Sequence, residues 1–346
     1  FNCSYCFTAK NRNPCGKPGE KMTDETEKLV IEFIRDLVLN HDSIVLGWNG
    51  GEPMLAFDTV CRITKAIQKI ALDEEKEFKA SFLTNGYLLD KEKALEMKNC
   101  GINQIGISID GPPEIHNKRR HLNNGEGTFD VILKNIKNIV DIFDISLLTF
   151  LDRNNVNSFL KLLDIYKNEG LIGKVNISCF SMQSCDLAGG IDENCFSREE
   201  YASILNALRG KAAQRGVNIQ QFPTQAWQGN CSGISMGSVA ISPEGDIYKC
   251  KTLVGDKTNS VGNLKDKGWK SNPNIIRWLT FDLLKNNKCI ECNILPICMG
   301  GCPLYEVLSS SKESSNNNYR FCPPIKYNIN EVLKFKYEQI LGRNAK

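Results

Sequence analysis

The spacing of the cysteines constrains this chain more than any other feature of its sequence. There are 15 cysteines among 346 residues, and seven follow one another in the last third: Cys231, Cys250, Cys289, Cys292, Cys298, Cys302 and Cys322. The N-terminus carries no basic-then-apolar export signal, so we expect the cytoplasm, where disulfides are unfavourable. Cysteines two residues apart are typical of metal sites. The last third is therefore predicted to bind metal.

Charge and hydropathy exclude several classes of partner. The chain has 43 basic and 40 acidic residues, a net charge of only +3, which gives no field suited to nucleic acid. No apolar run approaches the roughly 18 residues that would span a bilayer. We expect neither nucleic acid nor membrane as a partner.

The first two-thirds of the chain alternates β-branched runs with amphipathic segments, which predicts βα units around a parallel sheet. Five strands are expected: Ser43–Trp48, Lys79–Leu83, Gln104–Ile109, Asp144–Phe150 and Lys174–Phe180. Helices are expected near 24–39, 57–72, 90–99, 129–142, 155–169, 197–215 and 325–341, the first opened by a capping box of Asp24 and Glu27. A hairpin signal at 243–246 follows a domain change near residue 220, and the polar stretch 309–318 predicts a surface loop.

The chain opens with a Cys-x-x-Cys pair, Cys3 and Cys6, with an aromatic residue on each side of Cys6. Taken alone, this motif could be half a zinc site, a redox pair or chance. The segments that follow it narrow the choice.

Short polar motifs follow three of the predicted strands. They are Gly50-Gly51-Glu52-Pro53, Thr84-Asn85-Gly86 and Ser108-Ile109-Asp110-Gly111. Each alone could be a plain turn, but α/β folds bind ligands at the carboxyl ends of their strands. Arg119 and Arg120 come soon after the third motif, and an arginine is suited to hold a carboxylate with two hydrogen bonds.

These motifs, in this order and spacing, resemble the radical S-adenosylmethionine (SAM) superfamily. The resemblance implies a partial (β/α)6 barrel whose first strand would precede Phe1, together with a third cysteine two residues before it. It also implies that Cys3 and Cys6 bind a [4Fe-4S] cluster whose remaining iron holds SAM. The implied SAM contacts are Gly50, Gly51 and Glu52 for the amino group, Ser108 and Asp110 toward the ribose, and Arg120 for the carboxylate, with Arg119 as the alternative.

The seven later cysteines are similar to those of the SPASM domain, which carries two auxiliary [4Fe-4S] clusters. The resemblance assigns Cys289, Cys292, Cys298 and Cys322 to a distal cluster, and Cys231, Cys250 and Cys302 to a proximal one. Sulfatase maturases of the family supply a fourth proximal cysteine where this chain has Gln225, so either Cys195 or an open iron is expected there. Structural zinc sites are the alternative, because zinc accepts four thiolates at similar spacing. The implied domains are a radical SAM core over 1–220, a SPASM domain over 221–325 and a C-terminal helix over 326–346.

The resemblance implies an enzyme that modifies a peptide or protein and receives electrons from a donor such as a flavodoxin or ferredoxin. We expect maturation of a ribosomally made, cysteine-containing peptide by a thioether crosslink, because an open iron could hold a substrate thiolate. The alternatives are anaerobic sulfatase maturation, which forms formylglycine, and a zinc-stabilised binding module without catalysis. The remaining cysteines, Cys15, Cys61, Cys100, Cys179 and Cys185, are expected to be buried or free thiols, and the three histidines to be ordinary.

Overall fold

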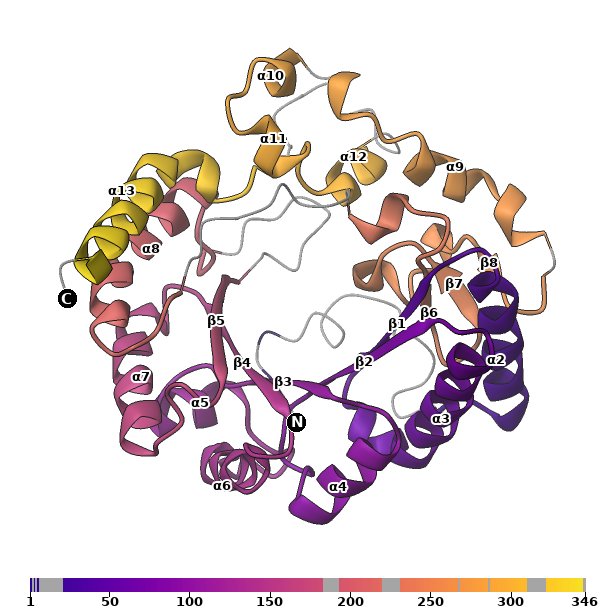
Figure 1. Cartoon of the computed structure of the whole chain (residues 1–346), viewed down its shortest axis with the longest axis horizontal. Helices are drawn as coiled ribbons and strands as arrows, with labels where there is room; N and C mark the ends of the chain where they lie inside the picture. Colours follow the sequence, from indigo (N-terminus) through magenta and orange to yellow (C-terminus); the bar gives the residue numbers. More distant parts are fainter. Residues whose placement is uncertain are drawn as a thin grey trace.

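A five-stranded parallel sheet forms the centre of the protein, with its strands in chain order (Figure 1). The computed structural model describes residues 1, 3, 5, 21–182, 193–219, 231–266, 268–285, 287–309 and 322–344. The strands are β1 (Ser43–Trp48), β2 (Glu77–Thr84), β3 (Gln104–Ser108), β4 (Asp144–Leu151) and β5 (Asn176–Ser181). All five predicted strands are present, and the α/β fold class is confirmed.

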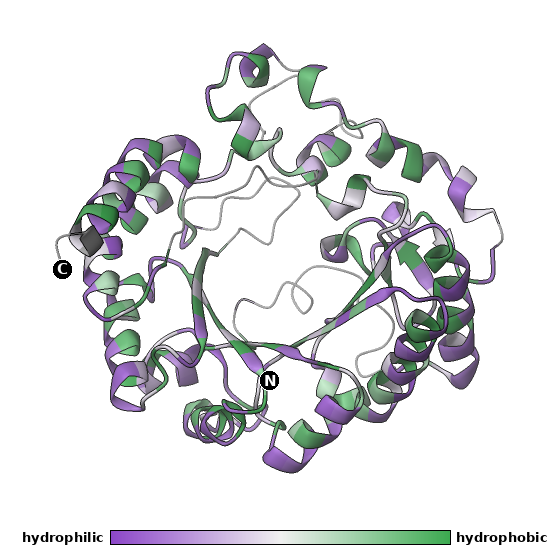
Figure 2. Cartoon of the chain, viewed as in Figure 1, coloured by the Kyte–Doolittle hydropathy of each residue, from purple (hydrophilic) through white to green (hydrophobic). Residues whose placement is uncertain are grey.

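Amphipathic helices cover the outer face of the curved sheet. They are α2 (Asp24–Val38), α3 (Phe57–Asp73), α4 (Lys91–Asn99), α5 (Pro113–Arg119), α6 (Phe129–Ile139), α7 (Phe159–Asn168) and α8 (Arg198–Ala213), with short 3-10 turns at Pro53–Ala56 (η1) and Val156–Ser158 (η2). Figure 2 shows hydrophobic and hydrophilic residues side by side on these helices, as amphipathic packing requires. Among the described residues, no helix is both long and apolar enough to cross a membrane.

The two faces of the sheet carry different side chains. The outward residues, such as Phe82 and Ile107, are buried against the helices in one large apolar core. On the opposite, concave face, Gly47 pairs with Ser81 and Gly106 pairs with Ser146. Larger side chains lie among these small ones, because a Cβ atom added at Gly106 would lie 2.7 Å from Leu83.

The N-terminus of α2 differs from the prediction. Its N-cap is Thr23, whose hydroxyl accepts a hydrogen bond from the Thr26 N–H at 3.1 Å. Glu27 does not complete a capping box, because its carboxylate accepts hydrogen bonds from Thr59 at 2.7 Å and Arg62 at 2.9 Å on α3. The predicted capping box at Asp24 and Glu27 is therefore wrong, since a partner distant in sequence takes the carboxylate.

The cysteine-rich region is built from short elements. A small antiparallel sheet contains β6 (Ala240–Ile241), β7 (Asp246–Tyr248) and β8 (Gly262–Asn263). The predicted hairpin joins β6 to β7, with Gly245 at φ 86°, a conformation that favours glycine. The helices that follow are α9 (Pro273–Leu279), α10 (Asn287–Ile290), α11 (Leu295–Cys298) and α12 (Pro303–Ser309), before the long C-terminal α13 (Ile325–Asn344).

This region bridges the two edges of the large sheet, so the chain forms a ring in Figure 1. On the β1 side, Phe33 of α2 packs on Trp269 with ring centroids 5.4 Å apart, and Glu25 pairs with Lys265 at 2.9 Å. On the β5 side, α13 packs on α8, where Asn328 donates to the Ala202 carbonyl at 3.2 Å. The predicted domain change near 220 and the predicted loop 309–318 fall largely outside the described residues.

Candidate active site

The carboxyl end of β1 is tied to the end of β2 through Glu52. One oxygen of its carboxylate accepts hydrogen bonds from the Met54 N–H at 3.0 Å and the Thr84 hydroxyl at 2.7 Å. The other accepts the Asn85 N–H at 2.7 Å. Glu52 thus caps η1 and links the two strand ends, and its carboxylate is held by three separate groups of the chain.

The two glycines before Glu52 lie in open space. Gly50 and Gly51 are exposed, and a Cβ atom added to either would meet no atom within 4 Å. Neither needs glycine for its backbone angles, since neither has a positive φ. Their lack of side chains therefore leaves room for a molecule at the end of β1.

The end of β3 carries a buried carboxylate between two arginines. Asp110 is 0 % exposed, and its Oδ2 atom lies 3.5 Å from Arg119 Nε and 4.0 Å from Arg120 Nη1. The hydroxyl of Tyr5 donates to the same oxygen and accepts from Arg120 Nη1 at 2.5 Å. Burial, with the Asp110 charge in addition, raises the pKa of Tyr5, so the phenol stays protonated and can donate. Ser108, two residues earlier, is 7 % exposed at the end of the same strand.

Arg119 is held more firmly than Arg120. It pairs with Asp152 at 2.7 Å, and its guanidinium lies over the Tyr5 ring, 4.8 Å from the centroid. The resemblance placed Tyr5 or Phe7 near the adenine or the cluster, but it did not predict the contacts of Tyr5 with Asp110 and Arg120. Asp152 did not stand out in the sequence, because it belongs to no contiguous motif and its partner Arg119 lies 33 residues earlier.

Several polar atoms of this group are buried without a hydrogen-bond partner in the described part of the chain. They are Asp110 Oδ1, Arg119 Nη2 and Arg120 Nε. Native proteins leave few such atoms unsatisfied, so each calls for a partner. A ligand with both acceptor and donor groups, such as the carboxylate and hydroxyl groups of SAM, meets that need. The residues therefore fit the cofactor that the motifs imply.

His116 supports this corner of the site from α5, a helix that the sequence did not predict. Its Nδ1 accepts the Asp110 N–H at 3.3 Å, and its Nε2 lies 3.1 Å from the hydroxyl of Thr128. That hydroxyl donates to the Arg120 carbonyl at 2.5 Å, so Nε2 carries the ring proton. Burial, with Arg120 and Arg119 nearby, lowers the pKa of His116 to about 3. The histidine is a neutral connector between the end of β3 and the arginine loop.

The N-terminal motif lies beside the arginines. Although burial opposes it, the pKa of Arg120 is raised by its neighbours Tyr5, Asp110 and Cys3. Phe1 contacts Tyr87 edge-on, with ring centroids 5.8 Å apart, at the end of β2. The structure thus brings Cys3 together with the predicted Asp110 and Arg120, while Cys6 lies outside the described residues.

The seven later cysteines fall into two groups by the thiols that lie around Cys298 and Cys302. Burial raises the pKa of Cys298, and the neighbouring thiols Cys322, Cys289 and Cys292 raise it further. Burial likewise raises the pKa of Cys302, with Cys231 and Cys250 as its neighbouring thiols and Arg198 as its neighbouring cation. These are the quartet and the trio that the sequence predicted as two ligand sets.

Both groups consist of cysteines. Among the described residues, no three His, Cys, Asp or Glu side chains lie close enough together to hold a single metal ion. Cysteine thiolates are the ligands of iron–sulfur clusters, so the chemistry of the two groups fits such clusters. Zinc also accepts four thiolates and stays the alternative.

The remaining described cysteines lie in the apolar core. Cys61, Cys100 and Cys179 are buried and free, as predicted. Cys195 is buried ahead of α8, and its predicted role as a fourth proximal ligand stays a prediction. Cys15, Cys185 and Gln225 are outside the described residues.

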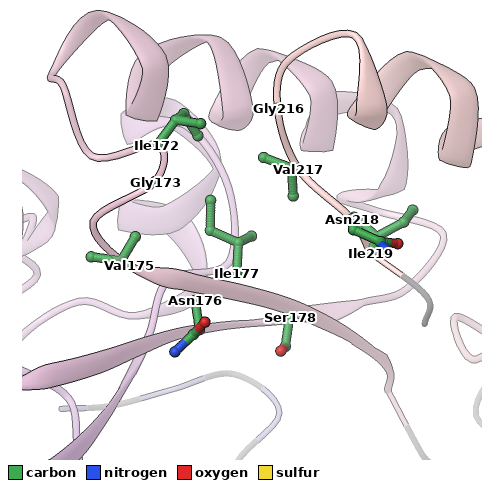
Figure 3. A pocket seen from close by; sticks show the side chains of 10 residues that line it. All are labelled: Ile172, Gly173, Val175, Asn176, Ile177, Ser178, Gly216, Val217, Asn218 and Ile219. Carbon is green, nitrogen blue, oxygen red and sulfur yellow. The ribbon is translucent and has the colours of Figure 1, made fainter. Parts of the chain in front are cut away.

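One described cavity lies away from these groups. It has a volume of 530 Å³ and is lined by Asn176–Ser178 of β5 and by Gly216–Ile219 after α8 (Figure 3). None of the predicted site residues lines it, and it opens beside the first half of β5 rather than its carboxyl end. Ligands of α/β folds bind at the other end of the strands, so we do not assign this cavity to the active site.

Comparison with known proteins gives the class. Residues 1–165, which contain the N-terminal cysteine motif, the sheet through β4 and the arginine pair, match the Radical SAM superfamily. This part of the chain is therefore a radical SAM domain, which confirms the resemblance drawn from its motifs, and the chain is an enzyme.

Relatives that cover most of the chain have several different activities. The chain is 25% identical over 327 residues to the AdoMet-dependent heme synthase of Nitratidesulfovibrio vulgaris, a match that covers 87% of this chain and 83% of the relative. It is 24% identical to the radical SAM cyclopropyl synthase TigE of Paramaledivibacter caminithermalis, covering 87% of this chain and 65% of TigE. It is 24% identical to the cysteine-type anaerobic sulfatase-maturating enzyme of Clostridium novyi, covering 87% of this chain and 84% of that enzyme.

Solved structures share the fold along the whole chain. Native anSMEcpe with bound AdoMet superposes with a TM-score of 0.70 at 18% identity, covering 99% of this chain and 96% of that one. The same protein with AdoMet and the Cp18Cys peptide gives a TM-score of 0.69 at 19% identity, covering 99% and 95% of the two chains. At these identities the likeness shows the fold alone.

Proposed function

We propose that this protein is a radical SAM enzyme that modifies a cysteine-containing peptide and carries two auxiliary clusters. The observation that carries the proposal is the separation of the later cysteines into a quartet around Cys298 and a trio around Cys302. A binding module without catalysis needs neither two thiol groups of unequal size nor a cofactor site at the strand ends.

The strand-end residues would hold SAM in one orientation. Glu52 has a fixed carboxylate beside the open space at Gly50 and Gly51, which suits an ammonium group. Arg120 has a buried, unpartnered Nε and is less engaged in ion pairs than Arg119, which suits the carboxylate. Ser108 and Asp110 would face the ribose, although Asp110 also balances both arginines.

Cys3 and Cys6 would bind the catalytic cluster next to this pocket. When bound, the cluster and SAM supply a 5′-deoxyadenosyl radical that removes a hydrogen atom from an unactivated carbon. The chain's own contribution is to position the cofactor and exclude water.

The auxiliary groups would supply the acceptor side of the reaction. The quartet has a thiol for each iron of a [4Fe-4S] cluster, whereas the trio leaves one iron without a described cysteine. An iron with an open position can bind a substrate thiolate and hold it near the carbon that loses hydrogen. This supports a thioether crosslink as the product. A flavodoxin or ferredoxin would be the electron donor of the catalytic cluster.

Sulfatase maturation is the second candidate. It is favoured by the relative from Clostridium novyi, a cysteine-type anaerobic sulfatase-maturating enzyme. The two products differ in the fate of the cysteine sulfur, because a thioether keeps it whereas formylglycine is an aldehyde that has lost it.

The test is anaerobic turnover by the reconstituted protein with SAM, a chemical reductant and one of three substrates. These are a cysteine-containing peptide encoded beside the gene, a peptide with a sulfatase cysteine motif, and iron-coproporphyrin III. We expect 5′-deoxyadenosine release to rise at least tenfold with the first peptide, and mass spectrometry to show loss of hydrogen with the sulfur retained. Loss of sulfur from the second peptide would favour sulfatase maturation instead. Turnover with the porphyrin alone would overturn the peptide proposal.

A further inference from the structure

The sulfur atoms of the two cysteine groups do not all receive hydrogen bonds from the same kind of donor. Cys298 accepts the backbone N–H of Gly300, and Cys302 accepts the backbone N–H of Leu304. In both cases the donor is two residues further along the chain. Such bonds stabilise the negative charge on a thiolate that binds metal.

Cys322 cannot use this arrangement. The residue two positions after it is Pro324, and the residue between them is Pro323. Proline has no N–H, so neither residue can donate to the sulfur. The backbone that leads into α13 therefore lacks the donor that Cys298 and Cys302 each have.

A lysine side chain supplies the donor instead. Lys326 Nζ lies 3.5 Å from Cys322 Sγ and donates to it. The Lys326 backbone N–H bonds to the Pro323 carbonyl at 3.0 Å, which closes the first turn of α13. Cys322 itself precedes the helix, and the turn from Pro323 to Lys326 brings the ammonium to the sulfur. The same charge also lies within electrostatic reach of Cys292.

A lysine differs from a backbone amide in one property that matters for a redox centre. Both can donate to sulfur, but only the lysine brings a full positive charge. Reduction adds an electron to a cluster, and a fixed cation beside it favours the more negative, reduced state. Hydrogen bonds to the sulfurs and local charge are among the factors that set the reduction potential of iron–sulfur clusters.

We propose that Lys326 is a positioning residue that raises the reduction potential of a cluster bound by Cys289, Cys292, Cys298 and Cys322. The inference rests on the proposed function, which assigns these four cysteines to the distal auxiliary cluster. A higher potential makes that cluster a better acceptor for the electron that leaves the substrate. The lysine thus favours transfer of this electron from the substrate toward the distal cluster.

The test is a potentiometric titration of the reconstituted full chain, followed by electron paramagnetic resonance. The variants are Lys326→Met, which removes donor and charge, Lys326→Gln, which removes charge only, and Lys326→Arg, which keeps both. Lys334→Met is the matched control, an exposed lysine on the same helix about 12 Å further along its axis. Iron content is measured for every variant.

We expect one redox wave to move to lower potential in Lys326→Met while the other waves stay in place. At a fixed poise the ratio of reduced to oxidised cluster should fall about tenfold, which is about 59 mV for a one-electron couple. In Lys326→Gln the potential of this wave should fall by a smaller amount. In Lys326→Arg and Lys334→Met it should equal that of the parent protein. All waves unmoved in Lys326→Met, with iron content unchanged, would overturn the role of the lysine and leave the proposed function intact.

A second variant separates failure of this inference from failure of the proposed function. It is the double variant Cys289→Ala/Cys292→Ala, which leaves only two of the four thiols and should abolish the wave that Lys326→Met shifts and lower the iron content. If the double variant leaves iron and all waves unchanged, these cysteines hold no cluster, and the auxiliary-cluster assignment falls together with the inference. If the double variant abolishes one wave but Lys326→Met moves a different one, the lysine acts elsewhere and only the inference is overturned.

Discussion

The contacts of the site converge on Asp110, whose carboxylate is shared by Arg119, Arg120 and Tyr5. Arg119 and Arg120 are offset by Asp110 and Asp152, so these four charges balance, and Arg119 contacts both carboxylates. Arg120 lies further from Asp110, at 4.0 Å, so its charge is more available to an anionic group. The arrangement thus explains why two adjacent arginines are needed, one as a fixed support and one to meet the ligand.

Removing the Tyr5 hydroxyl tests this arrangement. Tyr5→Phe keeps the ring beneath Arg119 but breaks the link between Asp110 and Arg120, and a hydrogen bond to a charged group contributes about 1.5–3 kcal/mol. We expect SAM affinity to fall roughly tenfold to a hundredfold. The measurement is equilibrium dialysis of labelled SAM with the reconstituted protein. Tyr87→Phe is the control, because Tyr87 contacts Phe1 through its ring. Equal affinities for Tyr5→Phe and the parent protein would contradict the prediction.

Glu52 and Arg120 should affect the cofactor without affecting the metal. Glu52→Ala and Arg120→Ala remove groups assigned to the ammonium and carboxylate of SAM, whereas the assigned cluster ligands are cysteines. We expect at least a tenfold loss of SAM binding and of reductive SAM cleavage with iron content unchanged. Iron analysis and 5′-deoxyadenosine release measure the two effects separately. Iron loss in either variant would show that these roles are wrongly assigned.

His116 should remain neutral across the usual range of pH. Because burial lowers its pKa from 6.5 to about 3, the folded protein excludes a proton that the unfolded chain binds below pH 6.5. Its contribution to stability is therefore complete above pH 6.5 and falls by about 1.4 kcal/mol per unit below that. Nitrogen NMR of the imidazole should show a neutral ring protonated at Nε2 down to pH 5.5, with the signal assigned by its loss in His116→Gln. A titration midpoint near 6.5 would refute the buried, neutral state.

At the scale of elements, sequence periodicity predicted the strands and the long helices, whose formation depends on local sequence pattern. All five strands and the long helices follow from alternation of apolar residues, so their bounds agree with the structure to within a few residues. Helix α5 was missed because its seven residues are too short and too polar for a periodic signal. The capping box at Asp24 failed because Glu27 is drawn to Arg62, 35 residues away, which no local rule contains.

In the candidate active site, too, features set by local sequence were predicted and features set by distant contacts were not. Residues in contiguous motifs, such as Glu52 and the cysteines, could be found by spacing. The contacts of Tyr5 with Asp110 and of Asp152 with Arg119 could not, because they join residues that are far apart in the sequence. The grouping of seven cysteines into four and three followed from the family resemblance, and the contacts around Cys298 and Cys302 agree with it.

The N-terminus of α2 gives a direct test at this scale. Thr23→Ala should weaken the first turn by about 1 kcal/mol, since the Thr23 hydroxyl accepts the Thr26 N–H. Asp24→Ala should cost less, because Asp24 is the first helical residue and only interacts with the helix dipole. Hydrogen exchange of the Thr26 and Glu27 amides measures both. A larger effect for Asp24→Ala would restore Asp24 as the N-cap.

At the scale of the whole molecule, the ring closes at two places of different character. The contact near β1 is an apolar one between α2 and the cysteine-rich region, with Phe33 and Trp269 at its centre. The contact near β5 depends on α13, which begins three residues after Cys322 and packs on α8. This second contact therefore links the β5 edge of the barrel to Cys322, one of the quartet of cysteines.

Asn328 is the residue on which this second closure depends most. It is 1 % exposed, sits where α13 kinks at φ −142°, and donates to the Ala202 carbonyl at 3.2 Å and to Asn206 Oδ1 at 3.0 Å. Asn328→Leu removes these bonds and leaves buried acceptors, a change that costs about 1–3 kcal/mol. We expect faster hydrogen exchange along α13, and partial loss of iron from the quartet because Cys322 leads into this helix.

Exchange in β2 to β4 should stay the same in Asn328→Leu, since these strands are held by the separate barrel core. Asn330→Leu is the control, an exposed asparagine on the same helix. Faster exchange spread evenly over the whole chain, or unchanged exchange in α13, would show that Asn328 does not hold the ring closed.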